Sequence, residues 1–241
     1  MSSKTNIIIS IVCFSLTIGL CFFLIVHKNG KELTDAIKFK KQFEAVSELE
    51  NPYTGNKYIN ITIDENNPFI YKTAKEVYEI MKNESAIIFM GYPESDLTRT
   101  ILPIFIDVLK EYSISKVYYL DIFDIRDEYK FSGSIMPELV KEGTNSYHQI
   151  VTLLDNYLDK YYVNDEVGNR YDTLVKRINT PTFITVKDGK IIDYHYGAVI
   201  NHDEEHFELN ELEHDKLKEI FEDMISKYKE ANEVCTEKSA C

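Results

Sequence analysis

The chain has 241 residues, with 40 acidic against 27 basic side chains and a formal net charge of −13. This length is enough for one domain with a substantial core and extensions at its ends. The acidic balance offers no basic stripe that could replace phosphate counterions, so we expect no nucleic-acid partner.

After a short N-terminal segment, residues 1–6, an apolar run covers residues 7–26 and is broken only by small or hydroxylated residues. A helix of that length spans about 30 Å, which matches the hydrocarbon core of a bilayer. The run ends in bulky residues rather than in the small residues of a cleavage site. It therefore predicts an uncleaved, single-pass membrane anchor.

The flanking lysines favour a cytoplasmic location for the rest of the chain, because more of them follow the anchor than precede it. Long domains can nevertheless cross the membrane whatever their flanking charge. Cys235 and Cys241 are close enough to pair, and such a pair persists only in an oxidising compartment. We therefore expect a cell-membrane protein whose soluble domain is extracytoplasmic.

Residues 27–55 are polar and predict a stalk, with helical character over residues 32–48. Residues 57–63 alternate with a period of two and are rich in β-branched side chains, which predicts a half-buried strand. A helix over residues 73–83 and a short apolar strand over residues 86–90 follow.

The next helix is predicted over residues 96–112, with Ser95 as its N-cap and Asp96 in its first turn. The other expected elements are a strand at 116–121, a helical insertion at about 131–172 with its clearest helix at 146–162, a hairpin at 182–186 and 190–194, and a final helix at 211–231. A cysteine-containing tail, residues 231–241, ends the chain. The expected fold class is α/β, with a central mixed sheet flanked by helices.

Four stretches, at residues 87–103, 117–128, 142–144 and 179–189, make the chain resemble the thioredoxin-like superfamily. More narrowly, it resembles the membrane-anchored thioredoxin-like proteins of Gram-positive bacteria, also called bacteriocin transport accessory proteins. The resemblance covers roughly residues 56–230. It implies a thioredoxin-like fold in which the bond before Pro181 is cis and Thr180 offers its backbone to an extended peptide.

The resemblance also implies two cysteines at the start of the 96–112 helix, but the motif here reads Ser95-Asp96-Leu97-Thr98. Thiol–disulfide exchange needs a thiolate, and a hydroxyl cannot replace it by this route. The alternative for Ser95 is a purely structural helix cap, with Thr98 an ordinary polar residue of the first turn.

The leading hypothesis is a binding protein with a degenerate active site, which holds an extracytoplasmic peptide or protein at Ser95, Asp96, Thr98, Thr180 and Pro181. One alternative is a thiol–disulfide oxidoreductase that uses Cys235 and Cys241, since an extended tail could reach about 36 Å. Another is an accessory subunit of a bacteriocin-type export or immunity system. We expect no cofactor and no metal, because His202 and His206 lie in an acidic segment typical of a surface loop.

Overall fold

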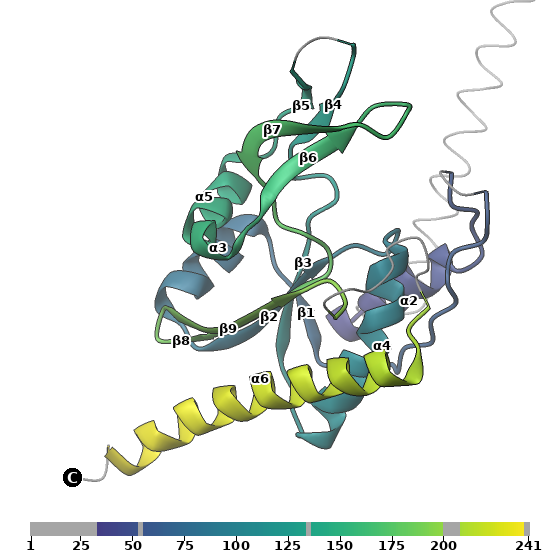
Figure 1. The fold of residues 1–241 in the computed structure, drawn as a ribbon. Helices are drawn as coiled ribbons and strands as arrows, with labels where there is room; N and C mark the ends of the chain where they lie inside the picture. Colours follow the sequence, from purple (N-terminus) through teal and green to yellow (C-terminus); the bar gives the residue numbers. More distant parts are fainter. Residues whose placement is uncertain (1–32, 53–54, 134–135, 200–207, 239–241) are drawn as a thin grey trace, which may run out of the picture. The chain divides into compact units, whose positions relative to one another are not determined.

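The computed structural model describes residues 33–52, 55–133, 136–199 and 208–238 (Figure 1). The chain from Asp35 onward forms one compact unit. The expected anchor, residues 7–26, lies outside the described residues. Among the helices that are described, none is both long and apolar enough to cross a bilayer.

A mixed five-stranded sheet in the order β1-β3-β2-β8-β9 forms the centre of this unit. Its strands are β1 (Phe69–Tyr71), β2 (Ala86–Gly91), β3 (Val117–Asp121), β8 (Thr182–Lys187) and β9 (Lys190–Tyr196). Strands β1 and β2 pair with β3 in parallel, whereas β8 is antiparallel to both β2 and β9. The carboxyl ends of the three parallel strands therefore share one sheet edge with the start of β8 and the end of β9.

Helices cover both faces of the sheet (Figure 1). They are α2 (Asp35–Val46), α3 (Ala74–Asn83), α4 (Asp96–Glu111), α5 (Asn145–Leu153) and α6 (Glu211–Lys238). Ile87 and Phe89 of β2 belong to a core that contains side chains of α2, α4 and α6. Ile88 and Met90 alternate with them and belong to the core beneath α3 and α5. A strand buried on both faces explains the continuous apolar run of β2.

The helical character expected over residues 32–48 is confirmed by α2, but the expectation that residues 27–55 form a polar stalk is wrong for α2. Phe39 and Phe43 of α2 are both 0% exposed, and Phe39 stacks on Phe69 of β1 with 4.1 Å between ring centroids. The polar residues form one face of this helix and the two phenylalanines the other. Their spacing of four residues, which places them on one side of a helix, is the signal that was missed.

The expected strand over residues 57–63 does not form, although Ile61 and Ile63 are buried with the predicted alternation. Side chains satisfy its backbone instead: the Ile63 amide donates to Glu44 Oε1 at 3.0 Å, and the Ile59 amide donates to Asp96 Oδ1 at 3.3 Å. The segment is thus an extended chain packed on the core without a neighbouring strand.

The insertion at 131–172 is not mainly helical. Besides α5 and a 3₁₀ turn (Asp155–Tyr157), this region contains two hairpins, β4 (Glu128–Lys130) with β5 (Glu138–Lys141), and β6 (Lys160–Asn164) with β7 (Arg170–Lys176). Asp165 ends β6 because its carboxylate accepts hydrogen bonds from the amides of Val167 and Asn169. The helix expected at 146–162 therefore forms only as α5, which ends at Leu153, and the chain from Lys160 onward is a strand.

The last helix also differs from its predicted end at residue 231, because α6 continues to Lys238. Cys235 therefore belongs to a helix rather than to an extended tail. A helix rises only about 1.5 Å per residue, so the reach assumed for the tail is too long. Cys241 lies outside the described residues.

Candidate functional site

The candidate site lies at the sheet edge where β2 runs into α4. The Met90–Thr182 pairing of β2 with β8 places the Thr180–Pro181 bond, which is cis as the resemblance implies, beside the turn that follows Gly91. The Gly197 amide, just after β9, donates to the Pro181 carbonyl at 2.9 Å. A Cβ on Gly197 would lie 4.0 Å from Leu97 in the first turn of α4. The start of α4 and the start of β8 are thereby brought together.

Ser95 is the N-cap of α4, as predicted. Its Oγ accepts a hydrogen bond from the Thr98 amide at 3.2 Å, which satisfies one of the amides that have no partner inside the helix. Thr98 is 0% exposed, and its hydroxyl has no hydrogen-bond partner among the described residues. The hydroxyl of Ser95 thus starts the helix, whereas that of Thr98 lies inside the protein.

The carboxylate of Asp96 is hydrogen-bonded within the protein. Its Oδ2 accepts from Asn51 Nδ2 at 2.9 Å, and its Oδ1 accepts from the Ile59 amide. The carboxylate therefore holds the extended segment near residue 59 against the first turn of α4. This role needs a partner far away in the sequence, so local patterning did not reveal it.

Arg99 is a buried residue beneath this edge that the sequence analysis did not single out. It is 1% exposed, and burial lowers the pKa of its guanidinium although the charges of nearby carboxylates oppose that shift. Its hydrogen bonds go to the carbonyls of Phe43, Ile59 and Pro93 and to the hydroxyl of Ser47. Because Pro93 belongs to the turn before Ser95, Arg99 fixes that turn from within the core.

Acidic groups lie on the β3 side of the same edge. Asp121 pairs in register with Gly91, and its carboxylate accepts from Gln42 Nε2 at 2.9 Å and from the Phe123 amide at 3.0 Å. Burial raises the pKa of Asp121. Burial also raises the pKa of Glu94, and the charge of Asp121 adds to that rise. The charge of Asp121 at the end of β3 thus acts on Glu94 in the turn before α4.

Thr180 has an open backbone. On its N-terminal side the Ile178 amide donates to the Tyr147 hydroxyl at 3.3 Å, and on its C-terminal side the Thr182 hydroxyl donates to the Asn179 carbonyl at 2.7 Å. Within the described part of the chain, neither the amide nor the carbonyl of Thr180 forms a hydrogen bond. The chain is thus held on both sides of Thr180, while the amide and carbonyl of Thr180 itself have no partner among the described residues.

Comparison with known proteins adds no relative to this picture. No protein-family description matches the sequence, and a search of the curated proteins finds no match. The described residues contain no group of three or more His, Cys, Asp or Glu side chains that could hold a metal ion. His202 and His206 lie outside those residues.

Of the five residues predicted to bind a peptide, Ser95, Thr180 and Pro181 meet at this edge. Asp96 and Thr98 follow Ser95 in the first turn of α4, but the Asp96 carboxylate is hydrogen-bonded within the protein and Thr98 is buried. Sequence reasoning also missed two arginines near this edge. Arg126 followed a predicted strand, within a stretch that carries the resemblance, and Arg177 comes three residues before Thr180.

Proposed function

We propose that this chain is a membrane-anchored protein of the thioredoxin-like type that binds an extended peptide outside the cell at the edge formed by Ser95, Thr180 and Pro181. The apolar run at residues 7–26 supports the anchor. The strand order, the helices on both faces and the position of Ser95 at the start of α4 support the fold assignment.

The observation that carries the proposal is the open backbone of Thr180. An extended peptide that pairs with unpaired main chain gains affinity from main-chain hydrogen bonds and specificity from pockets for alternate side chains. Thr180 directly precedes Pro181 at the start of β8 and lies beside the turn that ends in Ser95. A peptide laid across this edge would therefore pair with Thr180 and contact the start of α4.

Binding, rather than thiol exchange, suits the residues of this edge. The hydroxyls of Ser95 and Thr98 cannot form the mixed disulfide on which exchange depends. The alternative centre would need Cys235, whose backbone lies in α6, to act together with Cys241. No observation on the described residues favours that alternative.

Hydrogen exchange at Thr180 tests the proposal directly. The full-length protein in detergent is mixed with a pool of random-sequence nonapeptides, and exchange of individual backbone amides is followed by NMR. Slower exchange at Thr180 with rising pool concentration supports the proposal. The Gly197 amide is the internal control, because it is already bonded to Pro181. Unchanged exchange at Thr180 in a folded sample would contradict the proposal.

A further inference from the structure

Two of the four arginines of this acidic chain lie close to the Thr180 edge. The guanidinium of Arg126 lies 4.6 Å from the centre of the Tyr92 ring, in the turn between β2 and α4. The guanidinium of Arg177 lies 4.4 Å from the centre of the Tyr161 ring on β6. Burial lowers the pKa of Arg177, and the positive charge of Arg126 lowers it further, as expected for neighbouring cations.

Among the described residues, neither guanidinium has an acidic partner. In the described ranges, the side chains of Arg126 and Arg177 form no ion pair and no hydrogen bond, and Arg126 Nε is buried without an acceptor. A buried donor without an acceptor is costly, and for a charged group more so. Both residues are partly exposed rather than fully buried.

The carboxylates nearest in sequence to Arg126 are committed to other partners. Asp127 accepts from His148 Nε2 at 2.9 Å and from the Gly143 amide at 2.6 Å. Asp124 and Glu128 both lie 3.6 Å from Lys141 Nζ. These three carboxylates thus interact with lysine, histidine and backbone groups, and none of them forms an ion pair with Arg126.

Aromatic rings form the walls of this arginine pair. Tyr92 packs against Phe123 with 5.1 Å between ring centroids, and Tyr161 packs against Tyr129 with 5.8 Å between ring centroids. Rings stacked on a guanidinium hold its plane and leave its N–H edge for an acceptor. A planar carboxylate fits that edge through two parallel hydrogen bonds.

We propose that Arg126 and Arg177 form a binding site for a carboxylate of the bound peptide, either its C-terminus or an Asp or Glu side chain. This inference rests on the proposed function and adds a substrate class to it. The Arg177 guanidinium belongs to the segment that leads into Thr180, and Arg126 covers the turn that leads into Ser95. An acidic group of a peptide paired with Thr180 therefore comes within reach of both.

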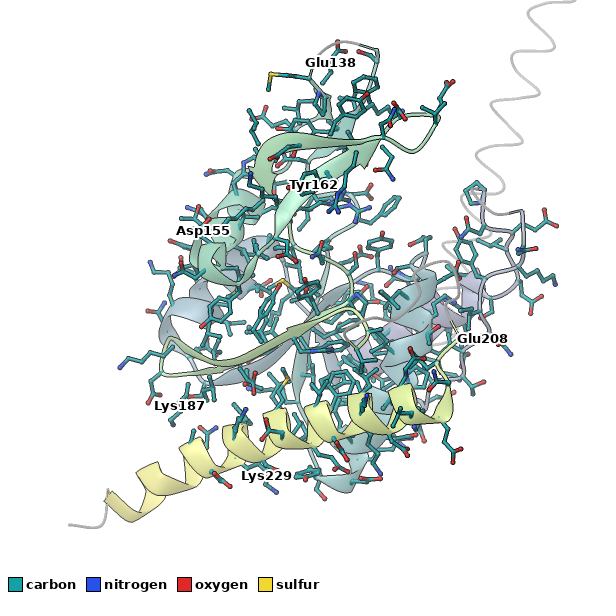
Figure 2. The ribbon with its side chains drawn as sticks, in the orientation of Figure 1. Glu138, Asp155, Tyr162, Lys187, Glu208 and Lys229 are labelled. Carbon is teal, nitrogen blue, oxygen red and sulfur yellow. The ribbon has the colours of Figure 1, made fainter. Side chains whose placement is uncertain are left out.

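The first test uses propionate as the probe and needs no peptide. The Nε–H signals of the four arginines are followed by NMR in the full-length protein during titration with propionate, and with the neutral propionamide as a control. We expect saturable shifts for Arg126 and Arg177 with propionate only. Arg170, which lies on the ring of Tyr162 at 4.0 Å (Tyr162 is labelled in Figure 2), is the matched control for a stacked surface arginine. Equal shifts at Arg170, or no saturable shift, would overturn the proposal.

The second test identifies the source of the carboxylate. Protection of the Thr180 amide is compared for three nonapeptide pools. The first has a free C-terminus and no Asp or Glu, the second is amidated and has no Asp or Glu, and the third is amidated and contains a single Glu. We expect one acidic pool to bind about tenfold more tightly than the neutral pool, the value of one charge-assisted hydrogen-bonded pair. Arg126→Gln and Arg177→Gln should abolish this advantage, whereas Arg170→Gln should keep it.

The outcomes separate the two proposals. Equal binding of all three pools would overturn the carboxylate site and leave peptide binding intact. Propionate shifts at Arg126 and Arg177 without protection of Thr180 by any pool would support the anion site but overturn the peptide as its source. Arg126→Lys, which keeps the charge but loses the planar fork, serves if the glutamine variant does not fold.

Discussion

The Arg99 guanidinium donates a hydrogen bond to the carbonyl oxygen of Phe43 at 2.9 Å, across 56 residues of sequence. Phe43 lies in the last turn of α2, so its carbonyl is one of those left without a partner inside that helix. Arg99 thus caps α2 with a side chain from α4 and joins the N-terminal part of the unit to the candidate site.

Replacing Arg99 should therefore destabilise the whole unit. Arg99→Met keeps much of the volume but leaves the carbonyls of Phe43, Ile59 and Pro93 without a donor, and we expect a loss of at least about 3 kcal/mol. Urea unfolding can be followed by tyrosine fluorescence, since the chain has 17 tyrosines and no tryptophan. The control Lys110→Met changes an exposed lysine of the same helix. Equal stabilities of the two variants would contradict this role for Arg99.

The buried hydroxyl of Thr98 should contribute nothing to stability. Since Thr98 Oγ1 has no partner among the described residues, Thr98→Val removes an unsatisfied polar group and should change the free energy of unfolding by less than about 0.5 kcal/mol, or raise it. Thr173→Val is the matched control, because the hydroxyl of Thr173 donates to the Tyr161 carbonyl at 2.7 Å. We expect the control to lose about 1–2 kcal/mol in the same unfolding assay. A larger loss at position 98 than at 173 would show that Thr98 has a partner.

Local signals in the sequence predicted the parts of the fold that depend on neighbours in the chain. Ser95, the predicted N-cap, begins α4 through its own side chain, and the helix predicted over residues 73–83 forms as α3, which the structure shows to be capped by Thr73 together with Glu76. The turn at Asp188 and Gly189 has positive φ at both residues, which suits the predicted hairpin. In each case the group that decides the structure lies within three residues of the position it controls.

Features that depend on distant partners could not be predicted in this way. The alternation of residues 57–63 correctly indicated which side chains are buried, but it could not show that Glu44 and Asp96 would take the backbone amides. Likewise, nothing in the sequence around Arg99 indicates that its acceptors lie in α2 and near residue 59. The candidate site was therefore located by the fold pattern, while the groups that hold it in place were not.

His195 should make stability depend on pH in a defined window. Burial lowers its pKa from the ordinary value of 6.5, and its Nε2 lies 3.1 Å from the Gly197 carbonyl next to the site. The unfolded chain therefore binds this proton more readily than the folded chain. The contribution of His195 to stability is constant above pH 6.5 and falls as the pH drops toward the lower pKa of the folded state. In urea unfolding, His195→Gln should show a smaller loss between pH 7.5 and 5.5 than the unchanged protein. An NMR titration midpoint for His195 at or above 6.5 would contradict this expectation.

Gly189 should tolerate no side chain. It has a φ of +75°, and a Cβ there would lie 2.0 Å from the Lys82 carbonyl oxygen at the end of α3. Gly189→Ala must therefore separate the β8–β9 hairpin from α3, and we expect a cost of at least about 3 kcal/mol. Gly168→Ala is the matched control, because Gly168 has a φ of +88° but nothing within 4 Å of its Cβ position. The control should lose only about 1–2 kcal/mol from the left-handed backbone, and an equal loss at both positions would exclude the steric contribution.

Introducing cysteines at the start of α4 should create thiol–disulfide exchange, an activity that the present residues do not support. The Ser95 hydroxyl lies at the N-terminus of a 16-residue helix, where a thiol has a lowered pKa, and Thr98 is one turn further on and fully buried. We expect Ser95→Cys with Thr98→Cys to form a disulfide and to reduce insulin in the presence of a dithiol. The assay is made in a background with Cys235→Ala and Cys241→Ala, so that turnover can be assigned to the new pair. Ser95→Cys alone is the control and should show no turnover. An inactive but folded double variant would contradict the proposed thioredoxin-like type of this turn. A separate outcome would favour Cys235 and Cys241 as a redox centre: activity of the unchanged chain that is lost when these two cysteines are removed.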